Sequence, residues 1–71
     1  MDFQLKFEFI ELDNLLKTLE LVASGAEAKQ IIQSGAVKVN GQVENRIRRK
    51  LRSGDSVEFR EQRINILSTP S

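Results

Sequence analysis

The fold is decided by one stretch in the middle of the chain, Ser24-Gly25-Ala26-Glu27-Ala28-Lys29-Gln30-Ile31-Ile32-Gln33-Ser34-Gly35-Ala36-Val37-Lys38-Val39-Asn40-Gly41-Gln42-Val43-Glu44. Its first half predicts a helix. Ser24 and Glu27 have the spacing of a capping box, in which the serine hydroxyl accepts the Glu27 amide and the carboxylate reaches back. One apolar stripe is formed by Ala28, Ile31 and Ile32. Gly35 is the left-handed residue expected to end this helix.

The second half of the stretch predicts a β-hairpin. Two short alternating segments, 37–39 and 42–44, flank the dipeptide Asn40-Gly41. A two-residue type I′ turn needs positive φ at both central residues, and Asn-Gly is the pair that adopts it most readily. The helix is therefore followed directly by a tight antiparallel hairpin.

On the N-terminal side, apolar residues first recur at every second position and then at every third or fourth position. Phe3, Leu5, Phe7 and Phe9 alternate with polar residues, which predicts one half-buried strand. A first helix over about 12–20 is predicted from the spacing of Leu12, Leu15, Leu16 and Leu19. We expect all four phenylalanines, including Phe59, to belong to the core.

On the C-terminal side, a turn at 53–55 separates a basic segment from a strand over 56–60. A second turn at 61–63 leads into a last strand over 64–67, and residues 68–71 are expected to fray. The predicted fold is α+β, with a two-helix hairpin packed on a small, mostly antiparallel sheet of short strands. Seventy-one residues suffice for a single domain, predicted to span 1–67.

The charges are unevenly distributed along the chain. The formal net charge is only +1, but residues 29–52 contain seven basic residues and one acid, Glu44. The rest of the chain is acidic. Ile47 and Leu51 are expected to anchor the segment 45–52 to the core while its basic side chains fan outward, since burying unpaired charge is costly. Such a cluster predicts a polyanionic partner.

The composition excludes several function classes. The chain contains no Cys and no His, so it lacks the commonest metal ligands and the usual nucleophile and general-base pairs. No glycine-rich phosphate loop is present, and no uncharged stretch is long enough for a membrane span. We expect a cytoplasmic, non-catalytic protein without a metal, a cofactor, a small-molecule substrate or a membrane partner.

The aromatic residues favour one kind of nucleic acid. Proteins that bind single strands stack bases on exposed rings, but this chain has no Trp or Tyr, and its phenylalanines are expected to be buried. Binding should then depend on cationic contacts to phosphates and on shape. Structured RNA with paired stems is the expected partner.

The chain also resembles a known family. Ser24-Gly25-Ala26-Glu27-Ala28-Lys29, Gly35-Ala36-Val37-Lys38-Val39-Asn40-Gly41 and Gly54-Asp55-Ser56-Val57, with Leu15-Leu16-Lys17, Ile32, Glu44, Arg46 and Arg49-Lys50, look like the S-four RNA-binding domain, or alpha-L motif. The likeness runs from about residue 12 to 59 and is greatest to the small stand-alone bacterial members. It implies that the helix hairpin and the adjoining loop face ribosomal or transfer RNA. Many members have Ser-Arg where this chain has Ser24-Gly25, so one expected phosphate contact is missing.

The charge pattern and the resemblance together define the expected site. The residues expected to contact RNA are Lys17, Ser24, Lys29, Gln33, Lys38, Arg46, Arg48, Arg49, Lys50 and Arg52. The protein is expected to be a monomer. Two alternatives stay open, namely an adaptor that docks an acidic protein and a DNA-binding protein that uses the two helices.

Overall fold

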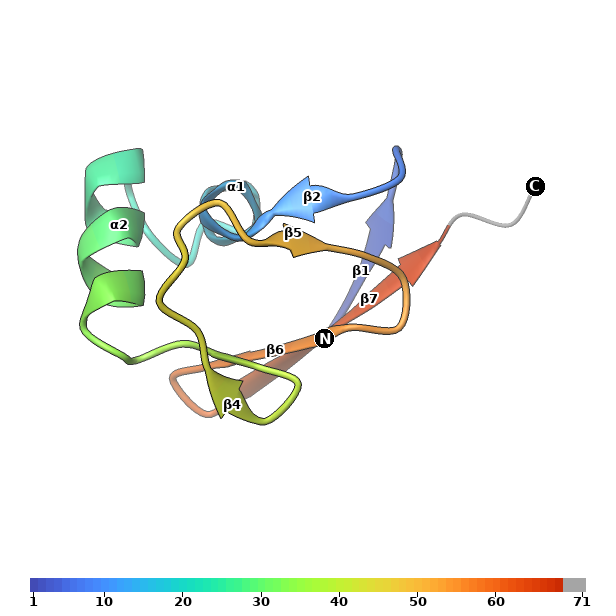
Figure 1. Cartoon of the computed structure of the whole chain (residues 1–71). Coiled ribbons are helices and arrows are strands. Elements are labelled where there is room, and N and C mark those ends of the chain that lie inside the picture. The colour runs from blue at the N-terminus through green and yellow to red at the C-terminus, as the bar shows by residue number, and fades with distance from the viewer. Residues whose placement is uncertain (69–71) are drawn as a thin grey trace.

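The computed structural model describes residues 1–68 as two helices and seven short strands (Figure 1). In chain order these are β1 (Asp2–Leu5), β2 (Ile10–Glu11), α1 (Leu12–Thr18), α2 (Gly25–Gln33), β3 (Lys38–Val39), β4 (Gln42–Val43), β5 (Lys50–Leu51), β6 (Ser56–Phe59) and β7 (Gln62–Ser68). The predicted α+β class is confirmed.

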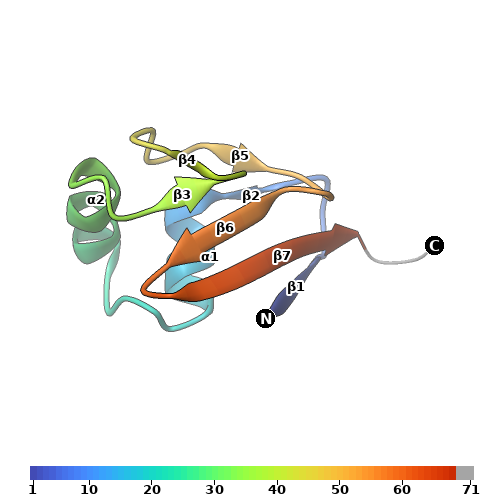
Figure 2. The same cartoon turned by 90° about the horizontal axis from the view of Figure 1, so that it is seen from below.

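The strands form two sheets. The larger sheet has the order β1-β7-β6-β3-β4, and the smaller one pairs β2 with β5 (Figure 2). Every pairing is antiparallel except that of β1 with β7, so the predicted mostly antiparallel sheet is confirmed. The two helices pack on each other as a hairpin.

One hydrophobic core joins the helices to the sheet. Helix α1 contributes Leu12, Leu15 and Leu16, which are fully buried, and α2 contributes Ala28 and Ile32. The sheet residues of the same cluster include Val39, Val57, Phe59, Ile64 and Ile66. Each of the predicted helix stripes therefore faces the core, which is why the helix hairpin has a fixed position on the sheet.

The local signals in the central stretch have the predicted effects. The Ser24 hydroxyl accepts a hydrogen bond from the Glu27 amide at 3.2 Å and so caps α2. The reciprocal bond to the Ser24 amide is not formed within residues 1–68, so only half of the capping box is present. Asn40 and Gly41 have φ of 54° and 83°, as a type I′ turn requires. Gly35, with φ of 84°, follows the helix.

The predicted strand over Phe3–Phe9 is wrong in its second half. The chain bends at residues 6–8, because β1 pairs with β7 in the larger sheet whereas β2 pairs with β5 in the smaller one. The bend turns Phe7 into solvent, where 82% of its surface is exposed. Phe3 and Phe9 are half-buried, and only Phe59 is a fully buried phenylalanine. The expectation of four core phenylalanines is therefore corrected.

Several boundaries also differ from the prediction. Helix α1 ends at Thr18, and Glu20 has φ of 58°. The last turn consists of Arg60 and Glu61, so β7 begins at Gln62. Ser68 lies in β7 opposite Leu5 and is not frayed, while residues 69–71 of the predicted tail lie outside the described residues. Within residues 1–68, no helix has the length and apolar character needed to cross a membrane.

Candidate nucleic-acid interface

The basic segment is held against the start of α1. Its apolar anchors behave as predicted, since Leu51 is fully buried and Ile47 packs against the core. The Arg49 carbonyl accepts from the Leu12 amide at 2.9 Å, and the Ile47 carbonyl accepts from the Asp13 amide at 3.1 Å. These bonds supply partners for first-turn amides of α1, which has no side-chain cap of its own. The segment thus has a defined path across the helix end.

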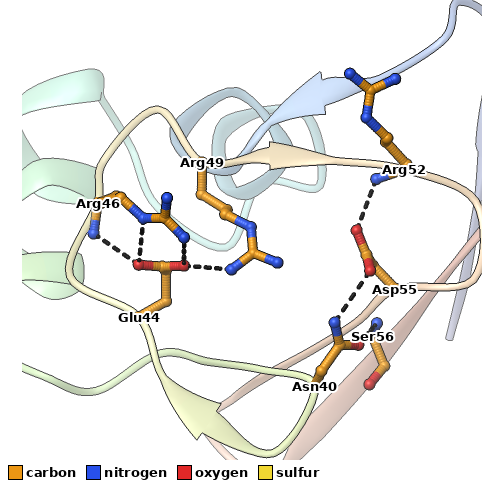
Figure 3. Close-up of polar contacts among 7 residues, drawn as sticks. All are labelled: Asn40, Glu44, Arg46, Arg49, Arg52, Asp55 and Ser56. Carbon is orange, nitrogen blue, oxygen red and sulfur yellow. Dashed lines mark hydrogen bonds and ion pairs between the residues drawn. The ribbon is translucent and has the colours of Figure 1, made fainter.

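Glu44 organises two of the arginines (Figure 3). Only 8% of this residue is exposed. One carboxylate oxygen accepts from the Arg46 amide and from Arg46 Nε, both at 3.1 Å. The other accepts from Arg46 Nη2 at 3.1 Å and from Arg49 Nη1 at 2.5 Å. Such bonds favour the charged carboxylate, and the hydrogen bonds from Arg46, followed by that from Arg49, outweigh burial and lower the pKa of Glu44 from 4.5 to about 2.

This ion-pair cluster corrects one detail of the prediction. The five basic side chains do not all fan outward, because Arg49 turns back onto Glu44 and keeps only 27% of its side-chain surface exposed. Arg46 pairs with the same carboxylate but remains 73% exposed. Although Arg49 turns inward, no unpaired charge is buried, because the Glu44 carboxylate compensates the charge of its guanidinium group. Arg48, Lys50 and Arg52 are exposed as expected.

Four cationic side chains line an open depression in the surface. The depression has a volume of about 460 Å³, and its lining consists of Arg46, Arg48, Arg49 and Lys50. We call it the basic depression. No carboxylate lines it, since Glu44 lies beneath the two arginines that it binds. A hollow with only cationic walls is suited to phosphate groups, which arginine can bind through two parallel hydrogen bonds.

A second polar network joins the Asn40-Gly41 turn to the end of the basic segment. Asn40 Oδ1 accepts from the Ser56 amide at 2.9 Å, and Asn40 Nδ2 donates to Asp55 at 3.0 Å. The other Asp55 oxygen accepts from the Arg52 amide at 2.8 Å. Burial raises the pKa of Asp55. The hydrogen bonds from Arg52 and Asn40, together with the positive charges of Arg49 and Arg52, outweigh burial and lower the pKa of Asp55 below its ordinary value. The hairpin and the segment are therefore positioned together (Figure 3).

The remaining predicted residues lie outside the basic depression. On the helices, Lys17, Ser24, Lys29 and Gln33 are all exposed. Lys17 extends toward the start of α2, where a Cβ built on Gly25 would lie 3.8 Å from Lys17 Nζ. Lys38 lines a different depression together with Glu58, Arg60, Glu61 and Arg63, where the charges are mixed. The contact of these residues with RNA stays a prediction.

Sequence reasoning missed two residues of this surface. For Glu44, the available signal is that it is the single acid among seven basic residues, and this pattern is shared by paired and solvated carboxylates. The alternation of apolar residues predicts Phe9 in the core, but the centre of its ring lies 4.9 Å from Lys50 Nζ and 5.7 Å from the Arg52 guanidinium carbon. No local pattern indicated this contact, because it depends on the pairing of β2 with β5.

Comparison with known proteins agrees with the fold and with the resemblance noted above. The sequence profile of the S4 domain family matches residues 3–67. The chain is 40% identical over 63 residues to "Putative RNA-binding protein YbcJ" of Escherichia coli strain K12 and to "Uncharacterized protein YbcJ" of Shigella flexneri, covering 89% of this chain and 90% of each relative. The solution structure of E. coli YbcJ, described as having an αL motif involved in RNA binding, superposes with a TM-score of 0.69 at 40% identity over 93% of this chain and 85% of that one. The chain therefore belongs to the S4 domain family.

Proposed function

We propose that this protein is a non-catalytic RNA-binding protein that recognises structured RNA, of the ribosomal or transfer RNA class, through the basic depression. The observation that carries the proposal is the all-cationic lining of that depression. It is built on anchored backbone, with Leu51 in the core and Arg49 bonded to the start of α1. Paired RNA stems present regularly spaced phosphates and bases that side chains reach poorly, so a rigid cationic surface is an appropriate means of recognition.

The relatives support the same conclusion. E. coli YbcJ is described as an RNA-binding protein, and its αL motif is described as involved in RNA binding. The present chain shares that fold and is 40% identical to YbcJ over the aligned residues. We extend RNA binding to this chain as a monomer acting in the cytoplasm, the compartment that this class of RNA implies.

Glu44 has a specific function in this proposal. Arginine side chains lose about 2 kcal/mol of rotamer entropy when they are fixed, and a binding site that is already ordered avoids part of that loss at the moment of binding. The carboxylate fixes Arg46 and Arg49, while Arg46 retains a large exposed surface. Arg48 makes no side-chain hydrogen bond or ion pair with residues 1–68, so its guanidinium is available to phosphate.

The decisive experiment is a salt titration of RNA affinity for wild type and Arg48→Gln. Arg48 is the suitable position because its substitution leaves the Glu44 cluster intact. The wild-type affinity for an RNA stem-loop should fall with rising salt at about 0.7–0.9 in log–log slope per neutralised phosphate. Arg48→Gln should reduce the slope by about 1 and keep the wild-type melting temperature.

Arg63→Gln is the matched control, since Arg63 pairs with the partly exposed Glu58 and lies outside the basic depression. It should retain the wild-type slope. Duplex DNA and an acidic protein should be compared as competitors against the stem-loop RNA. An unchanged slope in Arg48→Gln, or tighter binding to either competitor, would contradict the proposal.

A further inference from the structure

An aromatic surface lies at one end of the basic segment. Phe7 is 82% exposed, and Phe9 is half-buried beside it in the connection from β1 to β2. A surface pocket of about 250 Å³ opens here, and its lining consists of Phe3, Gln4, Leu5, Lys6, Phe7, Phe9, Ile10 and Thr18. An aromatic side chain left this exposed on a small domain has a hydrophobic face without a partner among the described residues.

Three cationic residues lie at this pocket or over its Phe9 ring. The register of β2 and β5 pairs Ile10 with Leu51 and Glu11 with Lys50, so continuing it brings Phe9 opposite Arg52 and diagonal to Lys50. Lys50 Nζ and the Arg52 guanidinium both lie over the Phe9 ring, at 4.9 and 5.7 Å. Lys6 lines the pocket as well. We call Lys6, Phe7, Phe9, Lys50 and Arg52 the aromatic surface.

The aromatic surface is continuous with the basic depression, because Lys50 belongs to both. A ligand that crosses from one to the other passes from four cationic residues to the exposed Phe7 ring and the half-buried Phe9 ring, over which Lys50 and Arg52 lie. A nucleic acid has the matching chemistry when a paired stem continues into an unpaired nucleotide. The phosphates are bound by cations, and the free base stacks on an aromatic ring.

We infer that the aromatic surface binds an unpaired nucleotide that flanks the RNA stem, with its base stacked on Phe7 and the neighbouring phosphate bound by Lys50 and Arg52. This inference rests on the proposed function, and it narrows the RNA to a stem with an adjacent single-stranded flank. Phe9 supports the site by holding the two cations, which lie over its ring. An acidic protein partner would use the same cations but would give Phe7 no stacking partner of this kind.

The test compares two RNAs that share one stem-loop, one with flush ends and one with a short unpaired flank on either side. Base–aromatic stacking is worth about 1–3 kcal/mol, so wild type should bind the flanked RNA about 5- to 150-fold more tightly. Phe7→Ala should abolish that preference and leave the affinity for the flush RNA unchanged. Because Phe7 is exposed, the variant should fold normally, and its melting temperature verifies this.

Two further variants sharpen the comparison. Phe9→Leu keeps an apolar side chain but removes the ring, and it should reduce the preference for the flanked RNA. Val43→Ala removes exposed apolar surface from the β3–β4 hairpin and should keep the preference. If Phe7→Ala lost affinity equally for both RNAs, or lost none for the flanked RNA, the inference would be overturned. The proposed function would still stand as long as wild type binds the flush RNA. Wild type that binds neither RNA would overturn both.

Discussion

Replacing Glu44 with glutamine is the most informative perturbation of the basic segment. Glutamine keeps the size and a hydrogen-bonding carbonyl but removes the charge that Arg46 and Arg49 share. The lowering of the Glu44 pKa from 4.5 to about 2 corresponds to at most about 3 kcal/mol. Arg46 is 73% exposed, so water and salt screen much of its interaction. We expect Glu44→Gln to lower the free energy of unfolding by about 1–2 kcal/mol at pH 7.

The stabilisation by Glu44 should depend on pH. A carboxyl group with a lowered pKa in the folded protein stabilises the fold above its unfolded value of 4.5, and that stabilisation is lost as the pH falls through about 2. The difference in unfolding free energy between wild type and Glu44→Gln should therefore be largest at pH 7. It should fall to about half or less at pH 3. Other carboxyl groups, including Asp55, titrate in both proteins and cancel from the difference.

Urea unfolding followed by far-UV circular dichroism measures this difference at pH 7, 5, 4 and 3. Glu58→Gln is the matched control, because Glu58 pairs with Arg63 at the surface and such pairs contribute between about 0 and 1 kcal/mol. A difference between wild type and Glu44→Gln that stayed constant from pH 7 to pH 3 would refute the reasoning. The loss would then come from packing and not from the carboxylate charge.

Three more predictions concern the turns and the helix cap. Gly41→Val should destabilise the domain by at least ~1 kcal/mol, because φ is 83° there, although a side chain would meet no other part of the described chain; an unchanged melting temperature would contradict the type I′ turn. Ser24→Ala should cost about 1 kcal/mol in urea unfolding, since the Glu27 amide loses its cap, and a loss below ~0.2 kcal/mol would show that the cap is unimportant. Glu61→Gly should raise stability by about 0.5–1 kcal/mol, because Glu61 has φ of 65° in a two-residue turn; a lower thermal midpoint would show that no strain is stored there.

The parts of the fold that were predictable are those specified by residues close in sequence. The Ser24 cap and the Asn40-Gly41 turn are each determined within about four residues, so both are readable without knowledge of the rest of the chain. The apolar period of α1 is local as well. Together these features determine the order of the elements. Because the sheet has an apolar face that must be buried, they also predict that the helix hairpin packs on that face.

The N-terminal error has the opposite cause. The alternation of Phe3, Leu5, Phe7 and Phe9 fits one strand perfectly, and no Gly or Pro interrupts it. The break follows from two pairings that are remote in sequence, since Phe3 pairs with Ile66 whereas Ile10 pairs with Leu51. A pattern of period two predicts which residues share a face, but not which sheet each half of the segment joins.

For the candidate site too, local sequence features were predictable and contacts between distant residues were not. The position of the basic segment and the exposure of most of its cations followed from composition and from the two apolar anchors, Ile47 and Leu51. The partner of each charge did not follow, because a lone acid in a basic segment can equally be solvated. The structure decides between these states by bringing Glu44 beside Val37, whose carbonyl accepts the Glu44 amide at 3.0 Å, and under two guanidinium groups.

The single acid changes what the proposed site can do. Without Glu44, Arg46 and Arg49 would repel each other and sample many rotamers, so binding would have to order both of them against that repulsion. With the carboxylate buried between them, part of their charge is neutralised, but both guanidiniums are fixed before any ligand arrives. Arg48 and Lys50 on the same depression form no ion pair within residues 1–68. The proposed interface therefore combines two ordered arginines, which favour a definite phosphate geometry, with cations outside any ion pair, which supply long-range attraction.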